Sequence, residues 1–264
     1  MITVTSAQLD AWLAMFAWPL ARILALISTD SIFGNRSVPA RAKIGIALLL
    51  TLLIVPTLGP MPEVQPGSAA GLFILMQQIV IGIAMGLAMR VVFVAVEMAG
   101  HMIGLQMGLG FATFFDPQNS VQVPVVASFL GLFAILVFFA IDGHLMIIAT
   151  LAESFQVLPI SAQPLSSVAW KHLVDWGAEI FSAGLLLSLP VIAALLITNL
   201  ALGIMTRAAP QLNVFAVGFP ITLLVGFLVL YLSMPFFIPL LERLFYQGLD
   251  ATMQMLRAAR PVFP

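Results

Sequence analysis

Long apolar segments that carry almost no charge constrain this chain more than any other feature. Residues 180–205 and residues 214–241 contain no charged side chain at all. About 20 apolar residues suffice for a helix to cross the hydrocarbon of a bilayer. Within hydrocarbon a segment must satisfy its own backbone hydrogen bonds, which favours helix. The sequence therefore predicts an all-α, integral-membrane-type protein.

The composition agrees with this prediction and excludes other classes of protein. The chain has 264 residues, of which 62% are hydrophobic and 8% are charged, whereas about a quarter of a soluble domain is charged. Lipid or partner proteins must cover the excess apolar surface. A net charge of −1 without a basic tract gives no electrostatic basis for binding nucleic acid. The absence of cysteine excludes disulfides and thiolate metal sites.

The apolar segments fall into six runs with polar or Pro/Gly-rich connections between them. The Pro/Gly-rich turn at 59–67 is short, so the two runs that flank it are expected to form a helical hairpin. The fourth run is expected to continue past Asp142 to about residue 158. The six runs are approximately 12–27, 44–58, 70–96, 125–141, 180–205 and 214–241.

The positive charges create a conflict about membrane topology. Lys and Arg gather in the first connection, at 36–43, and in the tail, at 243–260. Such enrichment marks the cytoplasmic side, yet six full crossings would place these two regions on opposite sides. We therefore expect that at least one run does not cross, or that the runs form hairpins held by other subunits.

Glycines recur every four residues along one part of the chain. Gly100, Gly104 and Gly108 show this spacing, and Gly82 and Gly86 repeat it one segment earlier. On a helix the spacing makes a smooth strip that another backbone can approach closely. The spacing predicts helix packing, with the partner either in another subunit or in the same chain.

The segment at about 108–122 differs in character from its apolar neighbours. Two glycines loosen the expected helix, an Asp-Pro pair stops it, and three phenylalanines lie on the breaking segment. Non-helical backbone at membrane depth is tolerated inside protein or beside a water-filled cavity, so we expect a re-entrant loop or plug. A plain exposed connection would explain the Asp-Pro pair but not the aromatics. The residues assigned to the plug are Gly108, Gly110, Phe111, Phe114, Phe115, Asp116, Pro117 and Asn119.

Five charged residues lie in or near the apolar runs. Charges in lipid are costly and usually face a partner or a cavity, so these side chains are predicted to be buried against protein. The five are Arg22, Arg90, Glu97, Asp142 and Arg207. Arg90 and Glu97 are seven residues apart, so they share a helix face without touching.

Signatures of catalysis or metal binding are weak. Glu97 and His101 have i, i+4 spacing, and Asp142 and His144 are also close in sequence, but two ligands without a third make a poor metal site. The sequence has no nucleophile elbow, Walker loop or HExxH motif. We expect no catalytic residue, no metal and no cofactor; an intramembrane enzyme acting through these side chains is the least favoured alternative.

Three stretches together resemble the FliR family of the flagellar type III export apparatus, whose virulence-system relatives are called SctT. They are residues 100–108 running into Asp116-Pro117, residues 142–159 with Asp-Gly-His, and residues 207–220. The resemblance covers nearly the whole chain, and Gly218-Phe219-Pro220 looks more flagellar than virulence-type. The motif residues in the third stretch are Pro210, Gln211, Asn213, Phe215, Gly218 and Pro220.

The resemblance implies a structural and gating subunit of a protein export channel. It implies a single domain over 1–264 built from FliP-like and FliQ-like helical hairpins in series, and a plug loop at about 108–122 that closes the pore for unfolded flagellar proteins. The implied partners are FliP and FliQ subunits, FlhB, the exported proteins in transit and membrane lipid. The implied place is the bacterial inner membrane at the flagellar basal body, extending toward the periplasm.

Two alternatives stand beside this reading. The chain could serve a virulence export gate, which is a close relative of the flagellar one. It could also be a stand-alone solute transporter with discontinuous helices at the membrane midplane, although that would need an internal repeat and a polar binding site, and neither is evident.

Overall fold

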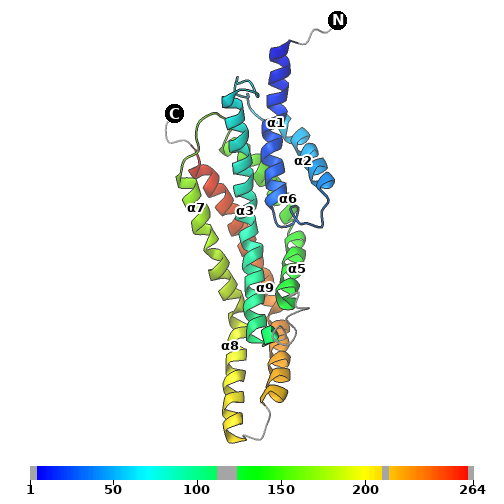
Figure 1. The fold of residues 1–264 in the computed structure, drawn as a ribbon, viewed down its shortest axis with the longest axis vertical. Helices are drawn as coiled ribbons and strands as arrows, with labels where there is room; N and C mark the ends of the chain where they lie inside the picture. The colour runs from blue at the N-terminus through cyan, green and yellow to red at the C-terminus, as the bar shows by residue number, and fades with distance from the viewer. Residues whose placement is uncertain (1–4, 112–123, 210–213, 261–264) are drawn as a thin grey trace. The chain divides into compact units, whose positions relative to one another are not determined.

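The computed structural model of the chain describes residues 5–111, 124–209 and 214–260, and within these ranges every regular element is helical (Figure 1). The predicted all-α class is confirmed. The elements are α1 (Ser6–Thr29), α2 (Ala40–Ile54), the 3₁₀ turn η1 (Val55–Thr57), α3 (Ala69–Gln106), the 3₁₀ turn η2 (Leu109–Phe111), α5 (Val125–Ala140), α6 (Gly143–Val157), α7 (Val168–Gly177), α8 (Glu179–Ala208) and α9 (Val214–Ala258).

The third apolar run is longer than its hydropathy predicts. It was expected to end near residue 96, yet α3 continues to Gln106 as one unbroken helix (Figure 1). It ends where Gly108 adopts φ 84°, a left-handed conformation that glycine adopts without steric cost and that commonly ends helices. With 38 residues, α3 is about 57 Å long, nearly twice the hydrocarbon thickness of about 30 Å.

The fourth apolar run is divided where the sequence predicts continuity. Helix α5 ends at Ala140, α6 begins at Gly143, and between them Asp142 has φ 56°. Among the described non-glycine residues Asp142 alone has a positive φ. Aspartate tolerates this left-handed conformation better than most residues, which lets the chain break here without a glycine at that position.

The sixth apolar run remains one helix in spite of its prolines. Pro220, Pro235 and Pro239 interrupt this run in the sequence, but all three lie inside the 45-residue α9. A proline removes one helical hydrogen bond. In apolar surroundings a full break would expose several backbone groups without partners, so the continuous helix is favoured.

Five stretches of helix in the described residues are long and apolar enough to cross a membrane, and α5 with α6 would make a sixth if read as one broken span. With five crossings, the basic connection at 36–43 and the C-terminal tail lie on the same side. Five crossings would therefore resolve the conflict found in the sequence, and a sixth crossing by α5 and α6 would keep it. The five are Gln8–Thr29, Ala40–Thr57, Ala69–Gln106, Val168–Ala208 and Ala216–Ala258.

The helices form two compact units, each assembled from separate parts of the chain. Unit 1 contains residues 1–91, 142–177 and 245–264, and unit 2 contains residues 92–141 and 178–244. Unit 1 therefore holds α1, α2, the first part of α3, α6, α7 and the end of α9. Unit 2 holds the second part of α3, α5, α8 and most of α9.

Unit 1 has a core in which α1 lies against α3. Gly82 faces Ala25 and the backbone of α1 closely enough that a Cβ would overlap it, and Gly86 meets Thr29 in the same way. Trp176 at the end of α7 donates its indole N–H to the Ala88 carbonyl on α3 over 2.8 Å.

Unit 2 is held by close approach of α5, α8 and α9 to α3. Gly100 on α3 lies against the backbone of Ala127 on α5, and Gly184 on α8 lies against Met98. Phe93 and Phe138 pack edge to face with centroids 5.8 Å apart. In both units the glycines thus find packing partners within the chain itself.

Candidate functional site

The structure describes only the start of the predicted plug. Gly108 ends α3 with φ 84°, and η2 follows over Leu109–Phe111, with Gly110 at its centre. Phe114, Phe115, Asp116, Pro117 and Asn119 lie outside the described residues, so their assignment to a plug stays a prediction.

The family-motif residues are described only in part. Pro210, Gln211 and Asn213 also lie outside the described residues. Phe215, Gly218 and Pro220 belong to the first turns of α9.

The most completely built polar site in the described chain surrounds Arg22, in unit 1. This side chain on α1 is fully buried. Its Nε donates to Gln78 Oε1 on α3 over 2.8 Å. Nη1 donates to the carbonyl and hydroxyl oxygens of Ser154 over 3.1 and 3.2 Å, and Nη2 donates to the Leu158 carbonyl over 3.0 Å. The guanidinium also lies 4.2 Å from the ring centroid of Phe155.

None of these acceptors in the described chain is a carboxylate, so another source of negative potential must offset the buried charge. Ser154 and Leu158 stand at the C-terminal end of α6, where the last carbonyls lack helical partners and the helix dipole is negative. A second arginine reaches the same end, because Arg260 Nε donates to the Val157 carbonyl over 2.6 Å. We call this arrangement of Arg22, Arg260 and the end of α6 the α6 cap.

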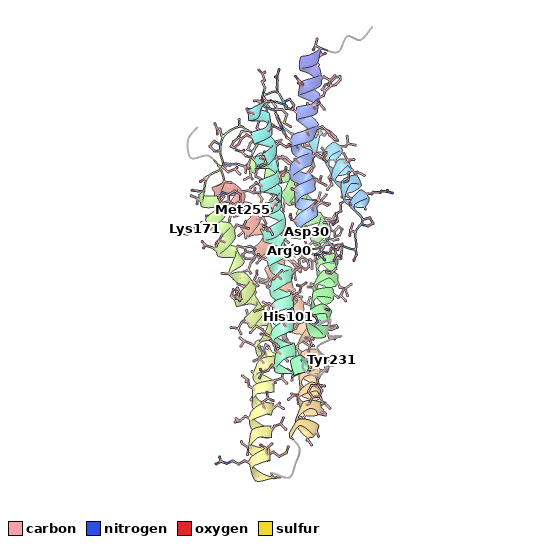
Figure 2. The ribbon with its side chains drawn as sticks, viewed as in Figure 1. Asp30, Arg90, His101, Lys171, Tyr231 and Met255 are labelled. Atoms are coloured by element: carbon pink, nitrogen blue, oxygen red, sulfur yellow. The ribbon has the colours of Figure 1, made fainter. Side chains whose placement is uncertain are left out.

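The other four charges predicted to be buried are exposed on the surface of the chain. Arg90 and Glu97 on α3, Asp142 at the α5–α6 break and Arg207 at the end of α8 all have exposed side chains. Burial of these four against a neighbouring subunit stays a prediction. Figure 2 marks Arg90 and His101 along α3.

Asp30, which follows the last residue of α1, is a buried carboxylate that is only half satisfied. Its Oδ2 accepts from the backbone N–H groups of Ile32 and Phe33 over 2.9 and 3.1 Å, whereas its Oδ1 is buried without a hydrogen-bond partner among the described residues. Burial raises the pKa of Asp30, and the backbone hydrogen bonds from Phe33, Ile32 and Ser31 oppose that shift.

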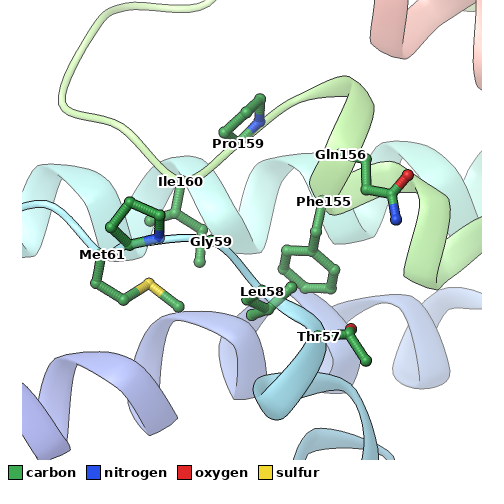
Figure 3. A pocket seen from close by; sticks show the side chains of 9 residues that line it. Thr57, Leu58, Gly59, Met61, Phe155, Gln156, Pro159 and Ile160 are labelled. Atoms are coloured by element: carbon green, nitrogen blue, oxygen red, sulfur yellow. The ribbon is translucent and has the colours of Figure 1, made fainter.

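A cavity of about 390 Å³ opens in unit 1 between the segment after α2 and the end of α6 (Figure 3). Phe155, which lies under the Arg22 guanidinium, also forms part of its wall. Binding sites for small molecules usually combine an apolar wall with a few convergent polar groups. No titratable side chain is among the described residues that line this cavity: Thr57, Leu58, Gly59, Pro60, Met61, Phe155, Gln156, Pro159 and Ile160.

Among residues 5–111, 124–209 and 214–260, no group of three or more His, Asp or Glu side chains is placed to hold a metal ion. His101 is exposed one helical turn from Glu97, so this pair remains two isolated side chains.

Three members of the Arg22 environment were not predicted from the sequence to belong to a site. Gln78 is a buried amide inside the third apolar run, and its polarity within that run was a usable signal. Ser154 and Arg260 carried no such signal, because their roles depend on where α6 ends.

Comparison with known proteins gives consistent matches over most of the chain. Residues 13–248 match the family model of bacterial export proteins, family 1. The chain is 49% identical over 250 residues to flagellar biosynthetic protein FliR of Pectobacterium carotovorum subsp. carotovorum, covering 95% of each chain. It is 47% identical over 245 residues to the protein of that name from Escherichia coli (strain K12), covering 93% of this chain and 94% of the relative. A more distant relative with that name, from Bacillus subtilis (strain 168), is 29% identical over 217 residues.

Proposed function

We infer the function from the family: this chain belongs to family 1 of the bacterial export proteins, the family of flagellar biosynthetic protein FliR. It is therefore a membrane component of a flagellar export apparatus. The flagellar names of its relatives favour a flagellar system over a virulence system. No residue is assigned a catalytic role.

We propose that within this apparatus the chain is a structural and gating subunit of the type III export channel. FliP and FliQ subunits and FlhB are its proposed partners, and unfolded flagellar proteins are its proposed cargo. We place the complex in the bacterial inner membrane at the flagellar basal body, extending to the periplasmic side. The length of α3, about 57 Å, supports that extension, because it exceeds what a bilayer of about 30 Å can cover.

We further propose that the segment at about 108–122 plugs the closed pore. The observation that carries this proposal is the manner in which α3 ends. An apolar helix of 38 residues stops at a left-handed glycine, Gly108, and leads into a segment with three phenylalanines. Bulky aromatic side chains on a glycine-loosened segment could fill a narrow pore and still be displaced by cargo.

Deleting residues 110–120 tests the plug. The assembled complex, reconstituted in planar bilayers, is expected to conduct ions continuously after the deletion, while subunit composition stays unchanged. The triple variant F111A/F114A/F115A should leak as well, because it removes the bulk that fills the pore. The matched variant Q118A/S120A alters the same segment but keeps the aromatics and the other residues assigned to the plug, and it should stay closed. A deletion complex that assembles with unchanged conductance would disprove the plug.

A further inference from the structure

The ionisable residues of α3 are arranged on one face of the helix. Among its 38 residues only Arg90, Glu97 and His101 are ionisable, and all three are exposed. At 100° per residue they fall within about 40° of one another around the helix axis. Arg90 and Glu97 are one heptad apart, about 10 Å along the axis. We call this face, defined by Arg90, Glu97 and His101, the charged stripe of α3; Figure 2 labels Arg90 and His101.

The described part of the chain supplies no partner for these charges. Within residues 5–111, 124–209 and 214–260, Arg90, Glu97 and His101 make no hydrogen bond or ion pair. Arg22 has four hydrogen bonds and a ring contact. The chain can therefore satisfy a buried charge in one place, and it leaves this stripe unpaired.

The surroundings of Glu97 are suited to a second helix. Glu97 Cγ and Oε1 each lie 3.7 Å from the position that a Cβ would have at Gly131 on α5. Ser128, one turn earlier on α5, is exposed and small. Small residues allow close approach of helices in membranes.

A carboxylate and a guanidinium on such a face are costly against lipid and usually pair with charges from a neighbour. We propose that the charged stripe of α3 docks a helix of another subunit that carries a basic residue opposite Glu97 and an acidic residue opposite Arg90, one heptad apart. This inference rests on the proposed role of the chain within an assembly, and it specifies the chemistry of one contact there.

The stripes of two copies of this chain do not fit one another. Two parallel copies would place Arg90 against Arg90 and Glu97 against Glu97, which is repulsive. Two antiparallel copies would pair the charges correctly but would require opposite orientations in the membrane. Topology signals such as the basic connection at 36–43 give a chain one orientation. Contact between the stripes of two copies is therefore excluded.

Charge reversal tests this pairing in the intact complex. R90E and E97R should each lower the yield of complex recovered from membranes by about tenfold or more, because each places like charges together at the interface. The double variant R90E/E97R should be at least as defective as either single variant, since both contacts become repulsive. The control K171E reverses an exposed charge on α7 and should assemble normally. Normal assembly of both single variants, or recovery of assembly in the double variant, would overturn the proposal.

Photo-crosslinking tests the occupant without altering the charges. A photoreactive amino acid replaces Val94, which lies on the same face between Arg90 and Glu97, and a control replaces the exposed Leu49 on α2. We expect position 94 to crosslink to a partner helix that contains an acidic and a basic residue one heptad apart. Crosslinks to lipid, to a second copy of this chain, or to a helix without that pair would refute the proposed contact. The plug is measured separately by conductance, so failure here leaves the gating proposal to its own test.

Discussion

Arg22 and Arg90 both lie on apolar helices of unit 1, yet the chain treats them in opposite ways. Arg22 is fully buried and donates to Gln78 and to the end of α6. Arg90 is exposed and has no hydrogen bond or ion pair among the described residues. The difference separates two uses of charge in a membrane protein. One arginine stabilises the fold of a single chain, and the other is left for whatever the chain binds.

Substituting the two arginines one at a time tests this comparison where the largest difference in stability is expected. R22A should destabilise the chain by about 3–5 kcal/mol, because it leaves a cavity and several buried acceptors without donors. R90A should change stability by less than about 0.5 kcal/mol, as exposed substitutions usually do. Thermal unfolding of the isolated chain in detergent, in which the charged stripe of α3 has no partner, measures both. Equal destabilisation by the two variants would show that the distinction is wrong.

Gly100 and Gly104 provide a second comparison, between a tightly packed position on α3 and one with room for a Cβ. G100A should cost about 1–3 kcal/mol, because its Cβ would overlap the Ala127 backbone and α5 would have to move. G104A should be nearly neutral, since its Cβ would meet Leu109 and Val126 at 3.9 Å, an ordinary contact, and alanine favours helix over glycine. Melting temperatures of the two variants provide the measurement. If G104A proved as costly as G100A, close approach would not be the cause.

The smallest effect on stability is expected at Asp30. It is intermediate between the two arginines, because its carboxylate is buried but only one of its two oxygens accepts hydrogen bonds among the described residues. Burial raises its pKa above the ordinary value of 3.8. A raised folded-state pKa in an acid means that its stabilising contribution is present below pH 3.8 and is lost as the pH rises through the folded value. The stability of the native protein relative to D30N should therefore fall as the pH rises above about 4 and then level off. Melting temperatures of both proteins over a pH series show the trend; a difference that is constant with pH would contradict it.

Hydropathy predicted the fold class and the existence of every long helix, since lipid-like surroundings leave few alternatives to helix. It did not predict the end of α3. The helix continues through Gly100, where the backbone of Ala127, distant in sequence, packs against the glycine. It ends only near Gly108, which has a left-handed conformation. The break at Asp142 was also missed, because the sequence shows one apolar run on both sides of it.

The candidate site was predictable only in outline. The sequence marked Arg22 and Arg90 alike, as charges in apolar runs, and no local signal distinguishes them. What separates them is the location of acceptors that are 56 to 136 residues away from Arg22. For the plug, the aromatic and glycine pattern supplied a hypothesis, and the described residues add only the way in which α3 ends.

The α6 cap also has a consequence for the order in which the protein is made. The acceptors of Arg22 on α6 follow it by 132 to 136 residues. At 5–20 residues per second, the ribosome needs on the order of ten seconds to produce them. During that interval α1 carries an arginine whose insertion costs roughly 2.5–3.5 kcal/mol at a helix centre. Helix α1 is therefore synthesised first, but the hydrogen bonds from Arg22 to Ser154 and Leu158 can form only after the end of α6 has left the ribosome.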